Sequence, residues 1–544
     1  MWIRLLCLST FLLTNTLSVI AQSGYFSGAF QSNANFFIRD EKIGAFNLPH
    51  YDNLKIGADA WLNLNYTNEK FGLEAGVRMD VFYNSILRVP TTPYTAVGIG
   101  NFYIKKKVKD LTITGGYIYD QIGSGIIFRS YEERPLGIDN AILGARLEYD
   151  IKEVVRLKAF AGVQKLKFSI QKPIIFGFNA DGNFNIKDKV LLQPGVGILN
   201  RSMDKESIDQ VVSTIETYDT LGRFVPKYNT YAATFYNTLT AGSFSWYVEG
   251  AFKTREAIKK DQIRDAKDTL INSSGNCVFT TMNYSKKGFG ITFQFKRTEN
   301  FYLHTSPNPT EALFDGLLSF LPPVSRQNSL RLPALYFAQS LENRELSFGT
   351  EITYSPNRKM TFIVQGSYIR DFLLKQYNPS DTAFFGEAYL AGQFKPTKSL
   401  EFEIGFHFAR YNKFIYRKEG HHDINAYTPF FELSYKINKK MSIRTEWQYQ
   451  HVIKDYGQWI FGLIEFNFAP HFSIAVSDMW NFKPNPEINP NANHYYNIFA
   501  AYTHGANRFS LAFVKQVEGI VCTGGVCRLE PAFSGVKLGI NSTF

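Results

Sequence analysis

Apolar and polar positions alternate along most of this chain in segments of about ten residues, which is the length that a tilted strand needs to cross a bilayer. Between Leu400 and Arg410, Leu, Phe and Ile share one face of a predicted strand, and Glu, Gly, His and Ala share the other. The same alternation occurs from Phe71 to Val81, from Phe289 to Lys296 and from Ile443 to Gln450. Because neighbouring side chains of a strand point to opposite faces, each segment predicts a strand with one apolar and one polar face.

The polar face distinguishes a membrane barrel from a soluble sandwich of sheets. A sandwich also alternates, but it would bury its apolar faces in a core and would not need strands this long. In this chain, glycines and charged residues of both signs recur on the polar face from one end of the sequence to the other. We therefore predict an all-β protein, a single antiparallel transmembrane β-barrel of roughly 20 strands, within a range of about 18 to 24.

The composition agrees with this interpretation and excludes two other classes of protein. The chain has 544 residues, of which 45% are hydrophobic and 16% aromatic, yet its mean hydropathy is −0.18. A helical membrane protein would need several runs of about 20 mostly apolar residues. A disordered chain would not contain 49 Phe and 31 Tyr.

The first 21 residues have the parts of a secretory signal peptide. Arg4 supplies a positive charge, a short apolar stretch begins at Leu5, and Val19-Ile20-Ala21 matches a cleavage site before Gln22. A retained membrane anchor is the alternative, although polar residues interrupt the apolar stretch. We predict a cleavable signal peptide over 1–21, a barrel over 22–544, and export to the cell outer membrane.

The two ends of the predicted barrel carry further information. The first strand is predicted near Tyr25, which leaves no room for an N-terminal plug domain, so the lumen is expected to be open or closed by the protein's own loops. Every second residue from Val536 to Ser542 shares one face of a last strand that ends at Phe544. This ending resembles the signal by which bacterial outer-membrane barrels are recognised and inserted. Barrel-assembly machinery and outer-membrane lipids are therefore expected partners.

The stretch from Asp120 to Asn140 loses the alternation and contains glycines and charges of both signs. It is either a loop that folds inward and pairs with lumenal charges or a bulged pair of strands. The lumenal-loop candidates are Asp120, Arg129, Glu132, Glu133, Arg134 and Asp139.

Two more stretches interrupt the pattern. From Met203 to Tyr218, apolar residues recur at helical spacing after Asp204, a possible cap, and predict a short surface helix. The stretch from Pro307 to Glu345 contains an apolar segment too short to span a membrane. This segment is expected to lie across the lumen or along the membrane interface.

Removal of the signal peptide leaves three cysteines. Cys522 and Cys527 flank a Gly-Gly turn, where a hairpin could bring the thiols within bridging distance, and we predict a disulfide there in an exported protein. Cys277 is expected to be a free thiol. No second cysteine pair and no nearby His completes a zinc site.

Candidate chemistry is otherwise sparse. None of the nine His lies in a recognisable hydrolase motif, and His421-His422-Asp423 places adjacent residues on opposite faces of a strand. The net charge is +11, but Lys and Arg are mixed with acids rather than gathered into a stripe. We predict no enzyme activity, cofactor, metal site or nucleic-acid partner. Lys105–Lys107 and Lys439–Lys440 are expected at strand ends, where they meet lipid headgroups or form hydrophilic turns.

Several segments resemble a known family. Tyr119 to Asn140, Phe320 to Gln327 with Ala334 to Tyr336, and Gly524 to Arg528 resemble uncharacterised exported barrels from Bacteroidota, a family of unknown function. The resemblance covers nearly the whole mature chain and implies an exported outer-membrane barrel. Because the family has no assigned activity, no functional residue is carried over.

Two functions follow from a polar lumen of mixed charge. The first is a porin-like channel or ligand-binding barrel, and the second is a structural or accessory subunit of a larger outer-membrane assembly whose paired lumenal charges fill the lumen. An outer-membrane enzyme is a third, less favoured option. The predicted lumen-lining residues are Asp59, Glu74, Arg78, Asp80, Arg146, Glu148, Glu401, Glu403, Arg444 and Glu446.

Overall fold

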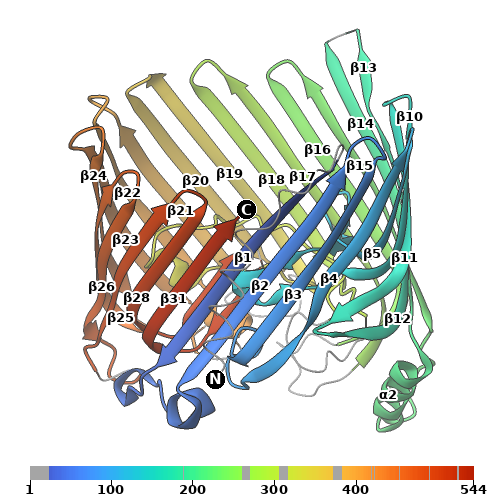
Figure 1. Ribbon diagram of the computed structural model, residues 1–544, viewed down its shortest axis with the longest axis horizontal. Coiled ribbons are helices and arrows are strands. Elements are labelled where there is room, and N and C mark those ends of the chain that lie inside the picture. Colours follow the sequence, from blue (N-terminus) through green and yellow to red (C-terminus); the bar gives the residue numbers. More distant parts are fainter. Residues whose placement is uncertain are drawn as a thin grey trace.

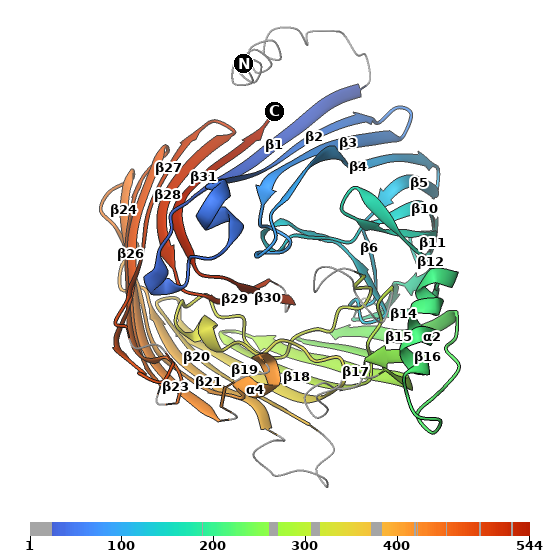
Figure 2. The same cartoon turned by 90° about the horizontal axis from the view of Figure 1, so that it is seen from below.

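One antiparallel sheet closes on itself to form a barrel (Figures 1 and 2). Twenty-four strands follow one another round the wall in chain order. The computed structural model describes residues 24–187, 189–259, 270–305, 316–371, 383–417, 420–421, 423–452, 454–488, 491–523 and 526–544, and for 520–529 it describes the backbone alone.

The wall strands are β1 (Gly24–Phe37), β2 (Ile56–Asn68), β3 (Leu73–Ser85), β4 (Tyr94–Val108), β5 (Leu111–Ile118), β10 (Ile142–Ile151), β11 (Val155–Leu166), β12 (Ser169–Gly182), β14 (Val190–Ser202), β15 (Asn229–Ala241), β16 (Phe244–Lys259), β17 (Leu270–Lys286), β18 (Phe289–Glu299), β19 (Arg344–Asn357), β20 (Met360–Arg370), β21 (Ala383–Phe394), β22 (Leu400–Tyr411), β23 (Ile424–Lys436), β24 (Met441–Val452), β25 (Gly457–Phe468), β26 (Phe472–Pro484), β27 (His494–His504), β28 (Asn507–Gln516) and β31 (Phe533–Thr543). The short strands are β6 (Asp120–Ile122), β7 (Phe128–Ser130), β8 (Glu132–Glu133), β9 (Ile138–Asp139), β13 (Phe184–Ile186), β29 (Gly519–Thr523) and β30 (Val526–Glu530). The helices are α2 (Lys205–Glu216) and α4 (Lys413–Arg417), with the single turns η1 (Glu41–Ile43), η2 (His50–Leu54), η3 (Arg134–Leu136) and η4 (Pro333–Tyr336).

The segments that alternate in the sequence lie in the wall. The four segments that carried the prediction fall in β22, β3, β18 and β24, which confirms them as strands. The strand number is the upper limit of the predicted range. The first wall strand begins at Gly24, next to the predicted Tyr25, while the predicted signal peptide over 1–21 lies outside the described residues. The absence of a plug domain stays a prediction.

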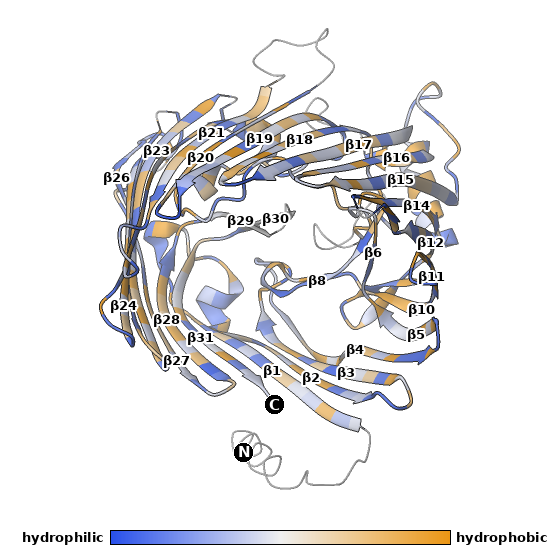
Figure 3. Ribbon diagram, turned by 90° about the horizontal axis from the view of Figure 1, so that it is seen from above, coloured by the Kyte–Doolittle hydropathy of each residue, from blue (hydrophilic) through white to orange (hydrophobic). Residues whose placement is uncertain are grey.

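The outward face of the wall is apolar, and along β26 its aliphatic residues lie between aromatic residues. Along β26, the exposed outward residues are Phe472, Ile474, Val476 and Trp480, in that order. Figure 3 shows apolar and polar positions alternating along the strands of the wall. This order matches the lipid-facing band and aromatic girdles of a transmembrane barrel. In the described part of the chain, no helix is both long and apolar enough to cross a membrane.

The two ends of the barrel differ. At the end where β2 turns into β3 and β4 into β5, the connections are short turns, and we call it the turn end. At the opposite end, which we call the loop end, the connections include the long segments 119–141, 203–228 and 300–343 (Figure 1). Helix α2 lies in the second of these segments, as predicted, and its cap Asp204 accepts hydrogen bonds from the backbone N of Glu206 (3.0 Å) and Ser207 (3.2 Å).

The seam between β1 and β31 ends on the last residue of the chain. The backbone N of Gly28 donates to the carbonyl of Phe544 (2.7 Å), and the backbone N of Phe544 donates back to Gly28 (3.0 Å). The Phe544 ring lies across Gly28, where an added Cβ would be 2.3 Å from the ring. The absence of a side chain at position 28 therefore allows the C-terminal aromatic ring to cover the seam.

We expect Gly28→Ala to destabilise the closed barrel, because the new methyl group would displace the Phe544 ring. The cost of such overpacking is about 1–3 kcal/mol. Urea-dependent loss of the compact, heat-modifiable band in gel electrophoresis would measure it. The matched control is Gly250→Ala, because an added Cβ at Gly250 meets nothing within 4 Å. Equal urea midpoints for the two variants would contradict the role of the Phe544 ring at the seam.

Candidate functional site

The inner face of the wall carries the residues that alternation assigned to the lumen. Asp59, Arg78, Asp80 and Glu446 are buried, although all four belong to a single-layer wall. The ten predicted lumen-lining residues lie on the strand face opposite the exposed apolar residues, namely Asp59 in β2, Glu74, Arg78 and Asp80 in β3, Arg146 and Glu148 in β10, Glu401 and Glu403 in β22, and Arg444 and Glu446 in β24. Their role in lining a solute path stays a prediction.

Arg78 is the centre of the most heavily paired cluster inside the barrel. Its Nε donates to Asp80 Oδ1 (2.6 Å) on the same strand. Its Nη1 donates to Glu132 (2.8 Å) and its Nη2 to Asp139 (2.7 Å), both on the segment 119–141. A buried guanidinium with three carboxylates is strongly held, since loss of one partner leaves an uncompensated buried charge. The segment 119–141 is therefore bound to the inner wall, and it folds inward rather than forming a bulged pair of wall strands.

Two further ion-pair groups fix the same segment. Lys165 Nζ pairs with Asp139 (2.5 Å), and Asp120 pairs with Lys158 (2.5 Å) and with Arg146 (3.2 Å). Burial alone would raise the pKa of Asp139, but the Lys165 ammonium and the Arg78 guanidinium outweigh it and hold that pKa below its usual value. Asp139 is therefore a carboxylate at neutral pH.

The other lumenal-loop candidates have different partners. Arg134 donates to Glu132 Oε1 (2.8 Å) within the segment and to Gln31 (2.8 Å) of the wall. In the described part of the chain, Arg129 forms no ion pair with a lumenal carboxylate, and its guanidinium lies 4.1 Å from the ring centre of Phe320. The expected charge pairing therefore does not extend to Arg129, which stacks on an aromatic ring instead. Glu133 lies in β8, and its register partner in β9 is Ile138.

A second segment, 316–343, runs along the inside of the wall and is joined to the first. The backbone N of Arg129 donates to the carbonyl of Leu318 (2.9 Å), and that of Phe320 to the carbonyl of Gly125 (2.9 Å). Leu318 and Leu321 are buried. The described part of the apolar segment thus lies on the lumenal side of the wall, and 306–315 fall outside the described residues.

Wall side chains hold this second segment by its backbone. The backbone N of Arg326 donates to Glu387 (2.7 Å), that of Leu332 to Gln448 (2.8 Å), and that of Leu341 to Glu345 (2.6 Å). A carboxylate that accepts a backbone N–H forms a charge-assisted hydrogen bond. The polar inner face therefore serves partly as a row of attachment points.

Glu249 of β16 attaches the turn between β6 and β7 in the same way. It is fully buried, and its carboxylate accepts hydrogen bonds from the backbone N (2.9 Å) and the hydroxyl (2.5 Å) of Ser124. Tyr247 (2.6 Å) and Thr234 (2.8 Å) donate to it from the wall. Alternation places Glu249 on the polar face, but nothing in the sequence links it to Ser124, 125 residues away, so sequence reasoning missed this contact.

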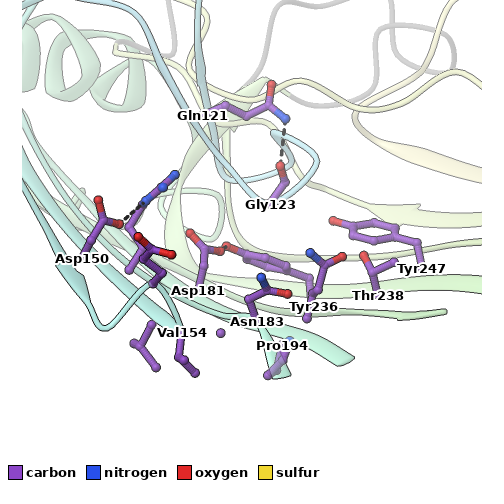
Figure 4. A pocket seen from close by; sticks show the side chains of 15 residues that line it. Gln121, Gly123, Asp150, Val154, Asp181, Asn183, Pro194, Tyr236, Thr238 and Tyr247 are labelled. Carbon is purple, nitrogen blue, oxygen red and sulfur yellow. Dashed lines mark hydrogen bonds and ion pairs between the residues drawn. The ribbon is translucent and has the colours of Figure 1, made fainter. Parts of the chain in front are cut away.

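A polar cavity of about 820 Å³ lies towards the turn end, between the inner wall and the β6–β7 turn (Figure 4). Side chains from β12, β14, β15 and β16 line it, together with Gln121 and the β10–β11 turn. Asp181 accepts hydrogen bonds from Asn179 (2.5 Å) and Tyr236. Among the described residues, the side chains of Asn183, Gln193 and Thr238 have no hydrogen-bond partner, so they are available to a solute.

Metal-binding and cysteine candidates have the following outcome. Among the described residues, no three His, Cys, Asp or Glu lie close enough to hold a metal ion. Cys277, in β17, is a buried free thiol, as predicted. Cys522 and Cys527 are direct partners in the β29–β30 hairpin, which confirms the hairpin. Their side chains fall outside the described residues, and the disulfide stays a prediction.

Basic residues are concentrated at the turn end. All those in its turns are exposed, and we call this set the basic rim: Lys70, Lys109, Lys152, Lys187, Lys189, Lys287, Arg358, Lys359, Lys395, Lys398, Lys439 and Lys440. In sequence, the same turns contain only four acidic residues, Glu69, Asp110, Glu153 and Asp188. The predicted position near strand ends is confirmed for both lysine groups, since Lys105–Lys107 lie at the end of β4 and Lys439–Lys440 lie in the β23–β24 turn. Their contact with lipid headgroups stays a prediction.

Comparison with family models matches one family over residues 1–544, described as a family of unknown function, DUF6029. The chain belongs to this family. Comparison with curated proteins finds no match. The Bacteroidota source stays a prediction.

This DUF6029 chain is similar to several solved barrel structures. The siderophore receptor PirA from Pseudomonas aeruginosa is 9% identical, with 95% of this chain and 80% of that chain covered and a TM-score of 0.39. The translocation pore of the P pilus usher PapC is 8% identical, covering 95% and 99%, with a TM-score of 0.44. The outer membrane protein OpdK from Pseudomonas aeruginosa is 9% identical, covering 84% and 100%, with a TM-score of 0.36. At these values, the likeness transfers no function to this chain.

Removal of the central guanidinium should release the segment 119–141 from the wall. In Arg78→Met, the buried Asp80 loses the guanidinium that it pairs with, and such a loss costs about 3–5 kcal/mol. We expect a protease to cut the segment much faster than in the wild type, with the barrel still heat-modifiable. Arg156→Met is the control, because Arg156 pairs with Asp150 (2.7 Å) and holds no inward segment. Equal cutting of the two variants would show that Arg78 does not hold the segment.

Proposed function

We propose that the protein is an outer-membrane β-barrel that admits or binds small hydrophilic solutes in its lumen, and that it acts without bond chemistry. The apolar outward face, with its many exposed aromatic residues, supports a location in a membrane. Bacterial outer-membrane barrels have short periplasmic turns and longer extracellular loops. The turn end would then face the periplasm, and the loop end the outside.

The polar cavity between the attached segment and the wall is the observation that carries the proposal. Its volume, about 820 Å³, lies within the range of small-molecule sites. Its lining is polar and includes unpaired amide and hydroxyl groups at Asn183, Gln193 and Thr238, which suit a solute that exchanges hydrogen bonds with water for hydrogen bonds with protein. The segment 119–141 bounds this cavity on one side, through Gln121 and Gly123. It would therefore set the width of any path through the lumen.

A structural subunit without conductance is the second candidate. Charge pairing across neighbouring strands of the inner face favours it: Arg444 of β24 pairs with Glu432 of β23 (2.8 Å) and with Glu465 of β25 (3.8 Å). Such pairs cancel charges that would otherwise attract ions. A complex that survives isolation in mild detergent would support this candidate, and a barrel that always purifies alone would count against it.

Planar-bilayer recordings test the first candidate. We expect the wild type to give stepwise ion conductance. Glu249→Gln should raise the conductance and the current noise, because the neutral amide has one acceptor oxygen in place of the two that receive Ser124, Tyr247 and Thr234, and hydrogen bonds to charged groups contribute about 1.5–3 kcal/mol each.

Glu403→Gln is the matched control for this recording. Glu403 is also an inner-face carboxylate, but it is held by Tyr389 and Gln393 (3.0 Å) of the wall and attaches no inward segment. A wild type that is folded and inserted but silent, with an equally silent Glu249→Gln variant, would overturn the channel proposal.

A further inference from the structure

The turn end and the loop end of the barrel differ in net charge. A path for solutes through the lumen would not require this difference. The basic rim has three times as many Lys and Arg as its turns have Asp and Glu, twelve against four. At the loop end, the segment 38–55 has three of each, and the segment 203–228 has five acidic and three basic residues. The basic excess of the chain is therefore concentrated at one end of the barrel.

The cations of the basic rim are largely without protein partners. Within the described residues, Lys395 is the rim residue that forms an ion pair, with Glu401 (2.9 Å). At the loop end, by contrast, the exposed Arg39 binds both Glu41 (2.9 Å) and Asp52 (2.9 Å), and Lys205 binds Asp209 (3.0 Å). The rim therefore presents positive charge that the protein itself does not neutralise.

Exposed aromatic side chains adjoin these cations on the outward face. Phe71, 58% exposed, follows Lys70 in the β2–β3 turn, and the Lys70 ammonium lies 5.9 Å from its ring centre. Phe289, two residues after Lys287, is also exposed. Aromatic rings of membrane proteins lie at headgroup level, and lysines beside them extend to the charged headgroups. The rim cations are thus placed at the depth of lipid phosphates rather than inside the lumen.

We propose that the basic rim binds anionic lipid headgroups in the leaflet at the turn end, and so enriches anionic phospholipid around the barrel. Polybasic segments at a membrane surface attract anionic lipids, and the attraction is screened by salt. The rim extends round the barrel from the β2–β3 turn to the β23–β24 turn, whereas the turns β15–β16, β25–β26 and β27–β28 contain no Lys or Arg. This inference rests on the proposed membrane location and is independent of whether the lumen conducts.

Lipid retention tests the proposal on the full chain. The protein is inserted into nanodiscs of equal phosphatidylglycerol and phosphatidylcholine and extracted in mild detergent, and the retained lipids are quantified by mass spectrometry. We expect the wild type to retain phosphatidylglycerol severalfold over phosphatidylcholine. A variant with Lys187, Lys189, Lys439 and Lys440 changed to Gln should lose most of this preference.

The matched control removes the same charge at the loop end, with Lys42, Lys205, Lys227 and Lys454 changed to Gln. It should retain phosphatidylglycerol like the wild type. Equal preference in all three proteins, or none in the wild type, would overturn the proposal. Binding of the wild type to soluble polyglutamate without a lipid preference would assign the rim to an anionic polymer and would also overturn it. Failure of all three to insert into bilayers would instead overturn the membrane location.

Discussion

Arg78 is buried inside the barrel wall, and a buried guanidinium must be paired with carboxylates to be stable. The first carboxylate partner of Arg78, Asp80, lies on the same strand. The second and third, Glu132 and Asp139, come from the segment 119–141. The charge of the wall therefore requires that the segment fold inward. With that segment in place, its backbone forms hydrogen bonds with the backbone of Leu318 and Phe320 in the second segment. Both segments therefore become part of the interior.

The two faces of the wall meet different solvents, and each explains one half of the alternation. The outward residues are exposed in the isolated chain, so only a lipid environment would bury them. The inward residues are polar, but the inward segments cover many of them, so these residues do not face water. Glu249, Glu387 and Gln448 bind backbone N–H groups that would otherwise be buried without a partner. A polar lumen in the sequence therefore does not by itself mean a water-filled one.

Local patterns predicted the wall well because strand alternation depends on neighbouring residues alone. The strand β22 and the helix α2 with its cap Asp204 follow directly from such patterns. A bulge in β4 was missed, although a signal was present: the outward apolar residues Val97 and Ile99 are odd-numbered, but Phe102 and Ile104 are even-numbered. The phase changes at a glycine, Gly100, where a Cβ would lie 1.8 Å from an oxygen of Asp80.

The candidate site was less predictable because its contacts join distant parts of the chain. Ser124 and Glu249 are 125 residues apart, and no local pattern indicates which of the many inward carboxylates receives which loop. The sequence could therefore indicate inward charges and an irregular loop, but not the attachment between them. The cavity is bounded partly by that attachment and was equally beyond prediction.

Hydrogen exchange of the membrane-inserted protein, followed by mass spectrometry, tests most directly whether the two inward segments are attached to the wall. The peptide 217–228, which contains the almost fully exposed Leu221 (99%), provides the fast reference, and β22 provides the slow one. The account predicts that amides of 119–141 and 316–343 exchange at rates close to those of β22, since their N–H groups are bound to the wall or to each other. Exchange as fast as that of 217–228 would contradict it.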